Sequence, residues 1–406
     1  LSGKIKGVMS ISFPKAVKII EKRELAIANI LNIANEIADF AQTEASTVDY
    51  ESGFPVETFQ RIRDAGLLAA PLDRNHGGLG LTGANVTTTL PLLQVFKSLG
   101  RGNLAVGRVY EGHVNALLLV ALYGAPEQIK FFADSAKAGK IFGVWNTEAG
   151  DGVKIFPTDN NNFRLEGAKT FASGTDFVTR PFVNCAFADG GWQMCIVPME
   201  KVATKTDESW WQPLGMRATR SFKVDFTDVE LSAENLIGAP GDYYCQPWFS
   251  GGAIRFAAVQ LGGAESLFDE TRKYLQKLNR TGDPFQRARL GEMAIRLESG
   301  NLWLNGASAA FDNYLRSEKS DADIEKVLAY VNMMRTAIEQ ICTDVMTLCE
   351  KCVGARGLMR PQLFERVIRD LTIYLRQPAP DAALCDAGRF VLENKIPANS
   401  IWRNEE

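Results

Sequence analysis

The stretch LGMRATRSFKVDFTDVEL, residues 214–231, holds the strand pattern that decides the fold. In its second half the apolar residues Phe222, Val224 and Phe226 are separated by charged residues. Alternation with a period of two predicts β-strands with one buried face. Four segments of the same texture precede it, IFGVWNT, FRLEGAKTF, PFVNCAF and WQMCIVP, and the turn signals DG, NNN and DGG separate them. We therefore predict a β domain over residues 141–238.

Helical periodicity flanks this β domain on both sides. From Val17 to about Ala41 apolar residues recur every three or four positions, which indicates an amphipathic helix. We predict a helical domain over residues 1–140 and a helical bundle over residues 239–406. Further helical segments are expected at 83–99, 104–123, 246–279, 284–318 and 320–353, with shorter helices after Pro126, Pro361 and Pro380. The fold class is mainly α with an inserted β barrel or sandwich, and a ligand cleft is expected between the β domain and the C-terminal helices.

The composition limits the classes of partner and reaction that this protein can have. The chain has 406 residues, of which 46% are hydrophobic and 23% charged, so intrinsic disorder is excluded. Lysine plus arginine number 45 and aspartate plus glutamate 48, and the net charge of −3 gives no field that would hold a nucleic acid. Only His76 and His113 are histidines, which disfavours a histidine-rich metal site, and no metal is expected. The chemistry is expected to depend on a bound cofactor or on carboxylates.

The seven cysteines form an odd set in apolar surroundings, which is typical of a reduced protein rather than of a disulfide framework. No apolar run reaches the roughly 18 residues of a membrane span. The first 25 residues contain lysines but lack the long apolar core of a secretory signal. We therefore expect a cytoplasmic protein with no membrane partner.

Six blocks along the chain occur in the order of one known family. They are HGGLGL (76–81), NTEAGDG (146–152), GAKTFASG (167–174), LGMRATRSFKVDFTDVEL (214–231), GARGL (354–358) and RDLTIYLRQ (369–377). Through these blocks the sequence resembles the acyl-CoA dehydrogenase family from about Thr47 to Glu393. The resemblance implies an N-terminal helical domain, a middle β barrel and a C-terminal helical bundle, with FAD held between the last two. It also implies a homodimer or homotetramer and a small-molecule substrate, in the first place an acyl-CoA.

The resemblance assigns cofactor roles to several residues. Asn146 and Thr147 would line the pyrimidine side of the flavin ring, and Phe171 and Ser173 would meet its central ring. Arg280 of a neighbouring subunit would contact the pyrophosphate. The remaining cofactor positions are expected in turns: Gly152, Val153, Phe285, Gly354 and Gly357. Without the family, the NTEAGDG block also fits an ordinary glycine-containing loop, and Arg280 also fits a solvated helix end. A valine at 153 replaces the serine usual in the family, so one hydroxyl that serves cofactor or substrate is missing.

The catalytic base is the main departure from the family. Family dehydrogenases remove an α-proton with a glutamate, but Pro378 and Ile254 occupy the two usual positions of that residue here. Two acids are candidates to replace it. Asp381 follows Pro380 and also fits the first turn of a helix, and Glu111 lies in the helix expected to form the floor of the substrate cavity. With Glu111, the residues expected to line that cavity are His113, Ile254, Arg255 and Pro378; His113 also fits a satisfied structural role.

Three functions remain open at this point. The first is an FAD-dependent oxidoreductase acting on the CH–CH group of an acyl-CoA-like substrate. The second is a flavin-dependent monooxygenase of the same fold, which needs no α-proton base. The third is a non-catalytic scaffold that retains the fold.

Overall fold

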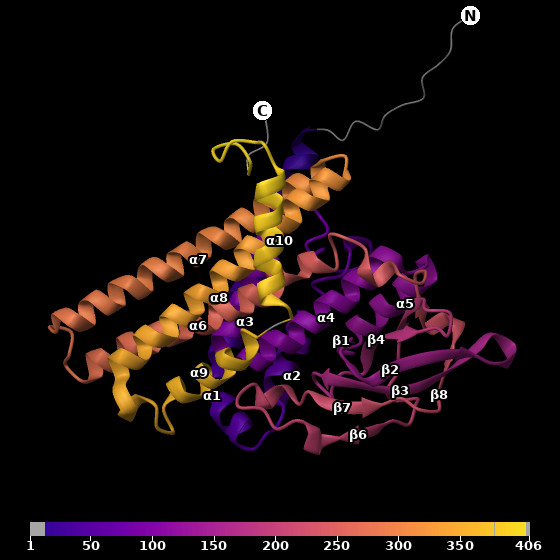
Figure 1. Cartoon of the computed structure of the whole chain (residues 1–406), viewed down its shortest axis with the longest axis horizontal. Helices are drawn as coiled ribbons and strands as arrows, with labels where there is room; N and C mark the ends of the chain where they lie inside the picture. The colour runs from indigo at the N-terminus through magenta and orange to yellow at the C-terminus, as the bar shows by residue number, and fades with distance from the viewer. Residues whose placement is uncertain (1–12, 377, 403–406) are drawn as a thin grey trace, which may run out of the picture.

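The computed structural model describes residues 13–376 and 378–402 (Figure 1). Its N-terminal part is helical, as predicted from the apolar periodicity. The helices there are α1 (Phe13–Tyr50), α2 (Val56–Asp64), α3 (Thr89–Gly102), α4 (Leu104–Tyr123) and α5 (Pro126–Lys137). Pro126 is the first residue of α5, where its missing N–H costs no hydrogen bond.

The middle part is one sheet of nine strands, in the order β6-β7-β3-β2-β4-β5-β9, with β1 beside β4 and β8 beside β3. The strands are β1 (Phe142–Trp145), β2 (Glu148–Pro157), β3 (Asn162–Ala172), β4 (Arg180–Ala186), β5 (Trp192–Ile196), β6 (Lys205–Asp207), β7 (Phe222–Asp225), β8 (Val229–Ser232) and β9 (Leu236–Ile237). Phe222 and Val224 are buried and alternate with partly exposed Lys223 and Asp225, which confirms the strand predicted from that alternation. The inserted β domain is therefore present.

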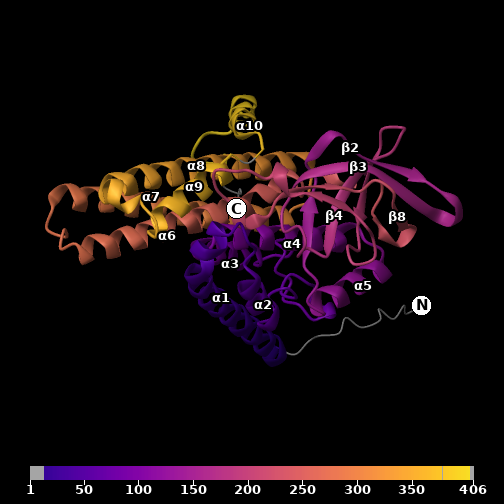
Figure 2. The same ribbon diagram turned by 90° about the horizontal axis from the view of Figure 1, so that it is seen from below.

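The C-terminal part is again helical. Its helices are α6 (Ala253–Lys277), α7 (Pro284–Arg316), α8 (Asp321–Gly357), α9 (Leu363–Tyr374) and α10 (Pro380–Glu393). Figure 1 shows α6, α7 and α8 running side by side to one end of the molecule, while the sheet lies at the other end. Seen from below, α10 projects above this layer of helices (Figure 2). No helix in residues 13–376 or 378–402 is long and apolar enough to cross a membrane.

Two helix starts were predicted wrongly. The helix expected over residues 246–279 begins only at Ala253, because 3₁₀ turns occupy Asp242–Tyr244 and Ser250–Gly252. The apolar pattern placed a helix start at Gly83, but α3 begins at Thr89. Gly83 and Thr87 have φ of 80° and 66°, and this left-handed backbone cannot continue into a right-handed helix. The residues between them therefore form a turn before α3.

Two glycines let the N-terminal helices pack against the C-terminal bundle. A Cβ added to Gly100 of α3 would lie 2.2 Å from the carbonyl oxygen of Val259 in α6, and one added to Gly262 of α6 would lie 2.0 Å from that of Lys97 in α3. The two backbones therefore touch in a way that no larger residue permits. Lys97 supports the contact through an ion pair with Glu265 at 2.9 Å.

Candidate active site

The main cavity has a volume of about 730 Å³ and lies where the sheet, α4 and the C-terminal helices meet. This is the cleft predicted between the β domain and the bundle. Its wall includes Asn146 and Thr147 after β1, Ser173 after β3, and Pro378 before α10. A site at this junction draws side chains from elements that are far apart in the sequence.

Helix α4 presents a polar stripe to the cavity. Arg108, Glu111 and Asn115, spaced three and four residues apart, all line its wall. Glu111 accepts a hydrogen bond from Arg108 Nη1 and lies 3.7 Å from Arg255 Nε. Arg255 Nη2 also donates to Asn115 Oδ1 at 2.8 Å. The carboxylate of Glu111 is thus held between two guanidinium groups.

A chain of three hydroxyl groups forms another part of the wall. The oxygens of Ser173 and Ser221 lie 2.8 Å apart, and those of Ser221 and Thr219 lie 2.6 Å apart. Thr219 donates its single proton to the carbonyl oxygen of Met216 at 2.8 Å. Ser221 must then donate to Thr219, and Ser173 must donate to Ser221. This order leaves Ser173 Oγ as a hydrogen-bond acceptor at the cavity wall.

The ends of β1 and β3 fix the backbone on which these groups sit. Trp145 Nε1 donates to the carbonyl oxygen of Ser173 at 2.9 Å, which ties the two strand ends together. Phe171 has a φ of 51°, in the left-handed region, and its ring lies 5.7 Å from that of Trp211 in an edge-to-face contact. Asn146 contributes a buried Oδ1 that has no partner among the described residues. A buried acceptor without a partner is costly, so this oxygen is suited to a donor on a ligand.

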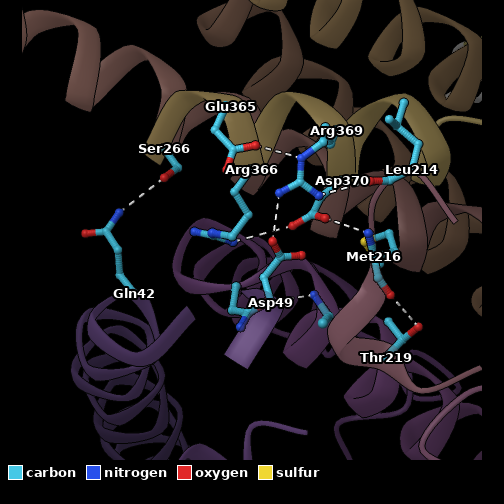
Figure 3. Close-up of polar contacts among 12 residues, drawn as sticks. Gln42, Asp49, Leu214, Met216, Thr219, Ser266, Glu365, Arg366, Arg369 and Asp370 are labelled. Carbon is cyan, nitrogen blue, oxygen red and sulfur yellow. Dashed lines mark hydrogen bonds and ion pairs between the residues drawn. The ribbon is translucent and has the colours of Figure 1, made fainter. Parts of the chain in front are cut away.

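A charged cluster behind the cavity positions the Met216 turn (Figure 3). Asp370 of α9 accepts from the N–H of Met216 at 2.5 Å, and Arg366 lies 3.5 Å from the same carboxylate. Arg369 donates to Asp49 at 2.7 Å and to the carbonyl oxygen of Leu214 at 2.9 Å. Burial raises the pKa of Asp370 to about 6. The turn that starts the hydroxyl chain is therefore bound to α9 at two points.

Five of the predicted site residues line this one cavity. Four of them were predicted to contact the flavin, and the fifth occupies the position of the family's base. They are Asn146, Thr147, Phe171, Ser173 and Pro378. Gly152 and Val153 were predicted beside them but lie outside the wall. Val153 is fully buried and its N–H donates to Glu148 Oε2 at 3.1 Å, while Gly152 has a φ of 73° and packs against the same carboxylate. Both belong to the interior of the sheet.

Of the predicted substrate-cavity residues, Glu111 and Pro378 line the wall, but His113, Ile254 and Arg255 do not. His113 bridges α4 to β1: its Nδ1 accepts from the N–H of Phe142 at 3.1 Å, and its Nε2 lies 2.8 Å from the carbonyl oxygen of Leu68. Burial lowers the pKa of His113 to about 4, so the ring is neutral and Nε2–H is the donor to Leu68. The satisfied structural role is the one His113 has. Ile254 is buried, and Arg255 lies behind the wall.

Four predicted cofactor residues lie at the far end of the bundle. Arg280 is exposed at the turn between α6 and α7, Phe285 is exposed in the first turn of α7, and Gly354 and Gly357 lie at the end of α8. Arg289 Nη1 donates to the carbonyl oxygen of Lys351 at 3.3 Å, so these two ends are neighbours. None of the four lines the cavity of its own chain. Any contact they make with a ligand there requires a second copy.

The candidate base Asp381 does not reach the cavity wall. It is exposed in the first turn of α10, where the helix dipole favours an acid. Glu111 does line the wall but is held by Arg108 and Arg255. Besides Glu111, the acids on the wall are Glu325 and Asp386, which come from α8 and α10.

Sequence reasoning missed Arg108, Asn115, Ser221 and Tyr374, which all line the cavity. Arg108 and Asn115 could have been found, because they share one stripe with Glu111 on a helix that is otherwise apolar. Ser221 lies in the 214–231 block, but only the folded strands show that it touches Ser173. Tyr374 lies in the 369–377 block, but only the fold shows that it lines the cavity beside Arg108.

Comparison with known proteins identifies the family. The family model for the acyl-CoA dehydrogenase N-terminal domain matches residues 30–139. The model for the acyl-CoA dehydrogenase C-terminal domain matches residues 241–375. A dibenzothiophene monooxygenase from Mycolicibacterium goodii is 22% identical over 405 residues, covering 90% of this chain and 94% of that protein. A probable FMNH2-dependent monooxygenase from Pseudomonas putida is 24% identical over 399 residues, covering 92% of this chain and 97% of that protein.

Among solved structures, the FMN-bound dibenzothiophene monooxygenase from Paenibacillus sp. A11-2 has the same fold. Its TM-score is 0.82 at 20% identity, over 92% of this chain and 99% of that one. The helical, sheet and helical parts of this chain therefore form the acyl-CoA dehydrogenase fold. Since both helical regions match one family, this chain belongs to the acyl-CoA dehydrogenase family and is a flavin-dependent oxidoreductase.

Proposed function

We propose that this protein is a monooxygenase that uses reduced flavin and dioxygen. The observation that carries the proposal is the direction of the hydroxyl chain. Because Thr219 gives its proton to Met216, Ser173 Oγ faces the cavity as an acceptor. The nitrogen of the central flavin ring carries a hydrogen only in the reduced state, so an acceptor at this position favours reduced flavin.

The cavity offers no free carboxylate at the positions where a dehydrogenase of this family has its base, which supports this proposal. Pro378 and Ile254 occupy the two positions where the family places its base, and Asp381 lies outside the cavity wall. Glu111 is held between two arginines, as a structural partner rather than as a free base. Oxygen insertion needs no α-proton base. The acyl-CoA dehydrogenation that the resemblance suggested first is therefore less well supported than the monooxygenase alternative.

The residues of the cavity fit a flavin ring. Asn146 Oδ1 is a buried acceptor without a partner among the described residues, as the imide N–H of the ring requires. Phe171 and Trp211 add aromatic surface to the same wall. Bound reduced flavin would supply the electrons that reduce dioxygen, so that one oxygen atom enters the substrate and the other leaves as water. The chain's own residues would hold the ring, position the substrate and limit the access of water.

For the form of the flavin we propose FMN, with the predicted FAD as the alternative. Two similar proteins are described with FMN, the FMN-bound Paenibacillus structure and the probable FMNH2-dependent Pseudomonas putida protein. FAD would extend beyond the cavity to a second copy's Arg280 and Phe285. Identification of the flavin released by heat from the purified protein separates the two.

We further propose that the chain self-associates through α7. Phe285, Ile295 and Leu302 on this helix are 71%, 66% and 61% exposed, and the last two are seven residues apart and so share one face. Exposed apolar side chains of this size are frequent at subunit interfaces. A second copy packed there would cover it and would bring Arg280 close to the first copy's cofactor, as the family resemblance implies.

The test of the function uses purified protein, FMN reduced before mixing, and deoxygenated buffer equilibrated with ¹⁸O₂. Indole and dibenzothiophene serve as first substrates, and mass spectrometry follows the label. Incorporation of one ¹⁸O atom into product supports the proposal. If acyl-CoA esters bleach the bound oxidised flavin without oxygen, the protein is a dehydrogenase and the proposal is wrong. A protein that binds neither FMN nor FAD would be the scaffold.

A further inference from the structure

The polar stripe on α4 is the feature that carries a further inference. Between Leu104 and Val120, fifteen residues of this helix are buried, and most of them are apolar. Arg108, Glu111 and Asn115 lie on one face and line the cavity. Charged and amide groups beside a cavity remain costly unless a partner is present. The stripe therefore indicates which chemical group the cavity accepts.

The charges of the stripe do not cancel. Two guanidinium groups, those of Arg108 and Arg255, share the single carboxylate of Glu111. Arg108 gives one hydrogen bond to Glu111, and its side chain is still 23% exposed at the cavity. The remaining N–H groups of Arg108 have no partner among the described residues. This end of the cavity is thus positive and rich in donors.

Asn115 and Tyr374 add two further donors. Arginine only donates, so the contact between Arg255 Nη2 and Asn115 Oδ1 requires the amide oxygen to face Arg255, which leaves the NH₂ group of Asn115 for the cavity. Tyr374 is 1% exposed, and its hydroxyl has no partner in the described part of the chain. Tyr374 lines the same cavity as Arg108 and Glu111.

At the other end of the cavity the arginines already have partners. Three arginines line it: Arg335 of α8, Arg376 just after α9, and Arg389 of α10. Glu339 pairs with Arg376 and Glu393 with Arg389, and the wall adds Glu325 and Asp386. Arg376 and Arg389 are thus each paired with a carboxylate, and two further acids line the wall beside them. Arg335 donates to the carbonyl oxygen of Pro378 at 3.0 Å and lies over the ring of Phe256. An anion is favoured at the α4 end.

We infer that the substrate carries an oxyanion, a carboxylate or a sulfur oxyacid, that binds to Arg108, Asn115 and Tyr374. The planar fork of a guanidinium matches two oxygens of such a group. Phe249, Phe256 and Tyr243 line the same cavity, so the body of the substrate is apolar or aromatic. The inference rests on the proposed function only in taking this cavity as the substrate site.

The test compares two probes of the same shape, indole-3-carboxylate and indole-3-carboxamide. Their dissociation constants are measured by calorimetry on the purified protein, with and without saturating FMN. The carboxylate is expected to bind at least about tenfold more tightly, because hydrogen bonds to a charged group are the stronger ones. Equal affinities would overturn the inference. Because binding is measured without turnover, a failure to oxygenate would count against the proposed function alone.

Three variants locate the anion. Arg108→Gln is expected to reduce the preference for the carboxylate to less than about twofold, while Arg335→Gln, its matched control in the same cavity, keeps it. Tyr374→Phe removes only an unpartnered oxygen, so the fold should tolerate it, and carboxylate affinity should fall severalfold. Loss of the preference in Arg335→Gln instead, or loss of FMN affinity without any loss of carboxylate affinity in Arg108→Gln, would contradict the assignment. So would unchanged carboxylate affinity in Tyr374→Phe.

Discussion

Asp370 accepts a hydrogen bond from the backbone N–H of Met216 across 2.5 Å, and this contact links α9 to the turn from which the hydroxyl chain starts. Met216 has a φ of 58°, an unfavourable conformation for a residue with a side chain. The carboxylate of Asp370 thus helps to hold a strained backbone in place. The donor order at Ser173 depends on that backbone, since the Met216 carbonyl fixes the first hydroxyl.

Asp370→Asn is expected to change how stability depends on pH. Burial raises the pKa of Asp370 to about 6 in the folded protein, so the folded state binds this proton more tightly than the unfolded state. Its contribution is most favourable below about pH 4 and is lost as the pH rises through 6, by roughly 2–3 kcal/mol. Urea unfolding of wild type and variant at several pH values measures the difference. If the stability of wild type and variant depends on pH in the same way, the raised pKa of Asp370 is ruled out.

His113→Gln is expected to act in the opposite direction over an overlapping range. The pKa of His113 is lowered to about 4 by burial, so between pH 6.5 and 4 the unfolded state binds the proton first. Wild type should lose up to roughly 3 kcal/mol as the pH falls through this range. The variant loses the contacts with Leu68 and Phe142 and is less stable at pH 7, but its stability should depend less on pH. The same urea series tests this, and an unchanged slope would contradict it.

Ser221→Ala tests the direction of the hydroxyl chain. Without the Ser221 oxygen, Ser173 no longer has to donate there and can turn its hydrogen toward the cavity. The variant should lose most of the preference for reduced over oxidised flavin, about tenfold, which corresponds to about 30 mV in the two-electron potential of bound flavin. Thr227→Ala, an exposed hydroxyl of the same domain, serves as the control. An unchanged potential would show that Ser173 already donates.

Asp381→Asn and Glu111→Gln test the two candidate bases. Asp381 is exposed in a helix first turn, so its variant should keep full turnover and lose at most about 1 kcal/mol. Glu111→Gln leaves Arg108 and Arg255 without a counter-ion and should lose about 3 kcal/mol or more of stability. Its kcat should fall by less than the roughly 10²–10⁴-fold loss of a missing general base. A larger fall in either variant would identify that residue as a base.

Two variants test whether a second copy of the chain completes the flavin site. They are Arg280→Ala and the double variant Ile295→Glu, Leu302→Glu. Charges on the α7 face should convert the protein to a smaller species in light scattering, because an apolar interface does not tolerate them. Both changes should weaken flavin binding, by about tenfold for Arg280→Ala. Lys277→Ala, an exposed cation one turn earlier, is the control for charge. A protein that stays associated with unchanged flavin affinity would refute the role of α7.

The fold was largely predictable because its signals are local. Alternation in Phe222–Asp225 predicts a strand, and Pro126 and Pro380 predict helix starts; the structure confirms all three. The start of α3 was missed because the left-handed backbone at Thr87 leaves no trace in the apolar pattern.

The site was predictable only where its residues lie in contiguous blocks. Asn146, Thr147 and Ser173 belong to such blocks, and all three line the cavity. The pairing of Ser173 with Ser221 joins residues 48 positions apart, which no spacing rule connects. Gly152 and Val153 do not line the cavity, because a motif shared with a family indicates a strand end but not which of its residues face inward.

The stripe on α4 also has an evolutionary consequence. The residues around its three cavity-facing positions are core, so substrate preference can change at 108, 111 and 115 without repacking the molecule. Single steps are obstructed, because removing one member of a buried charge cluster is costly, whereas replacing the whole cluster with apolar residues is often neutral. New substrate ranges in this lineage should therefore arise by joint exchange of Arg108, Glu111 and Arg255, and libraries that vary these positions together should recover folded variants for uncharged substrates.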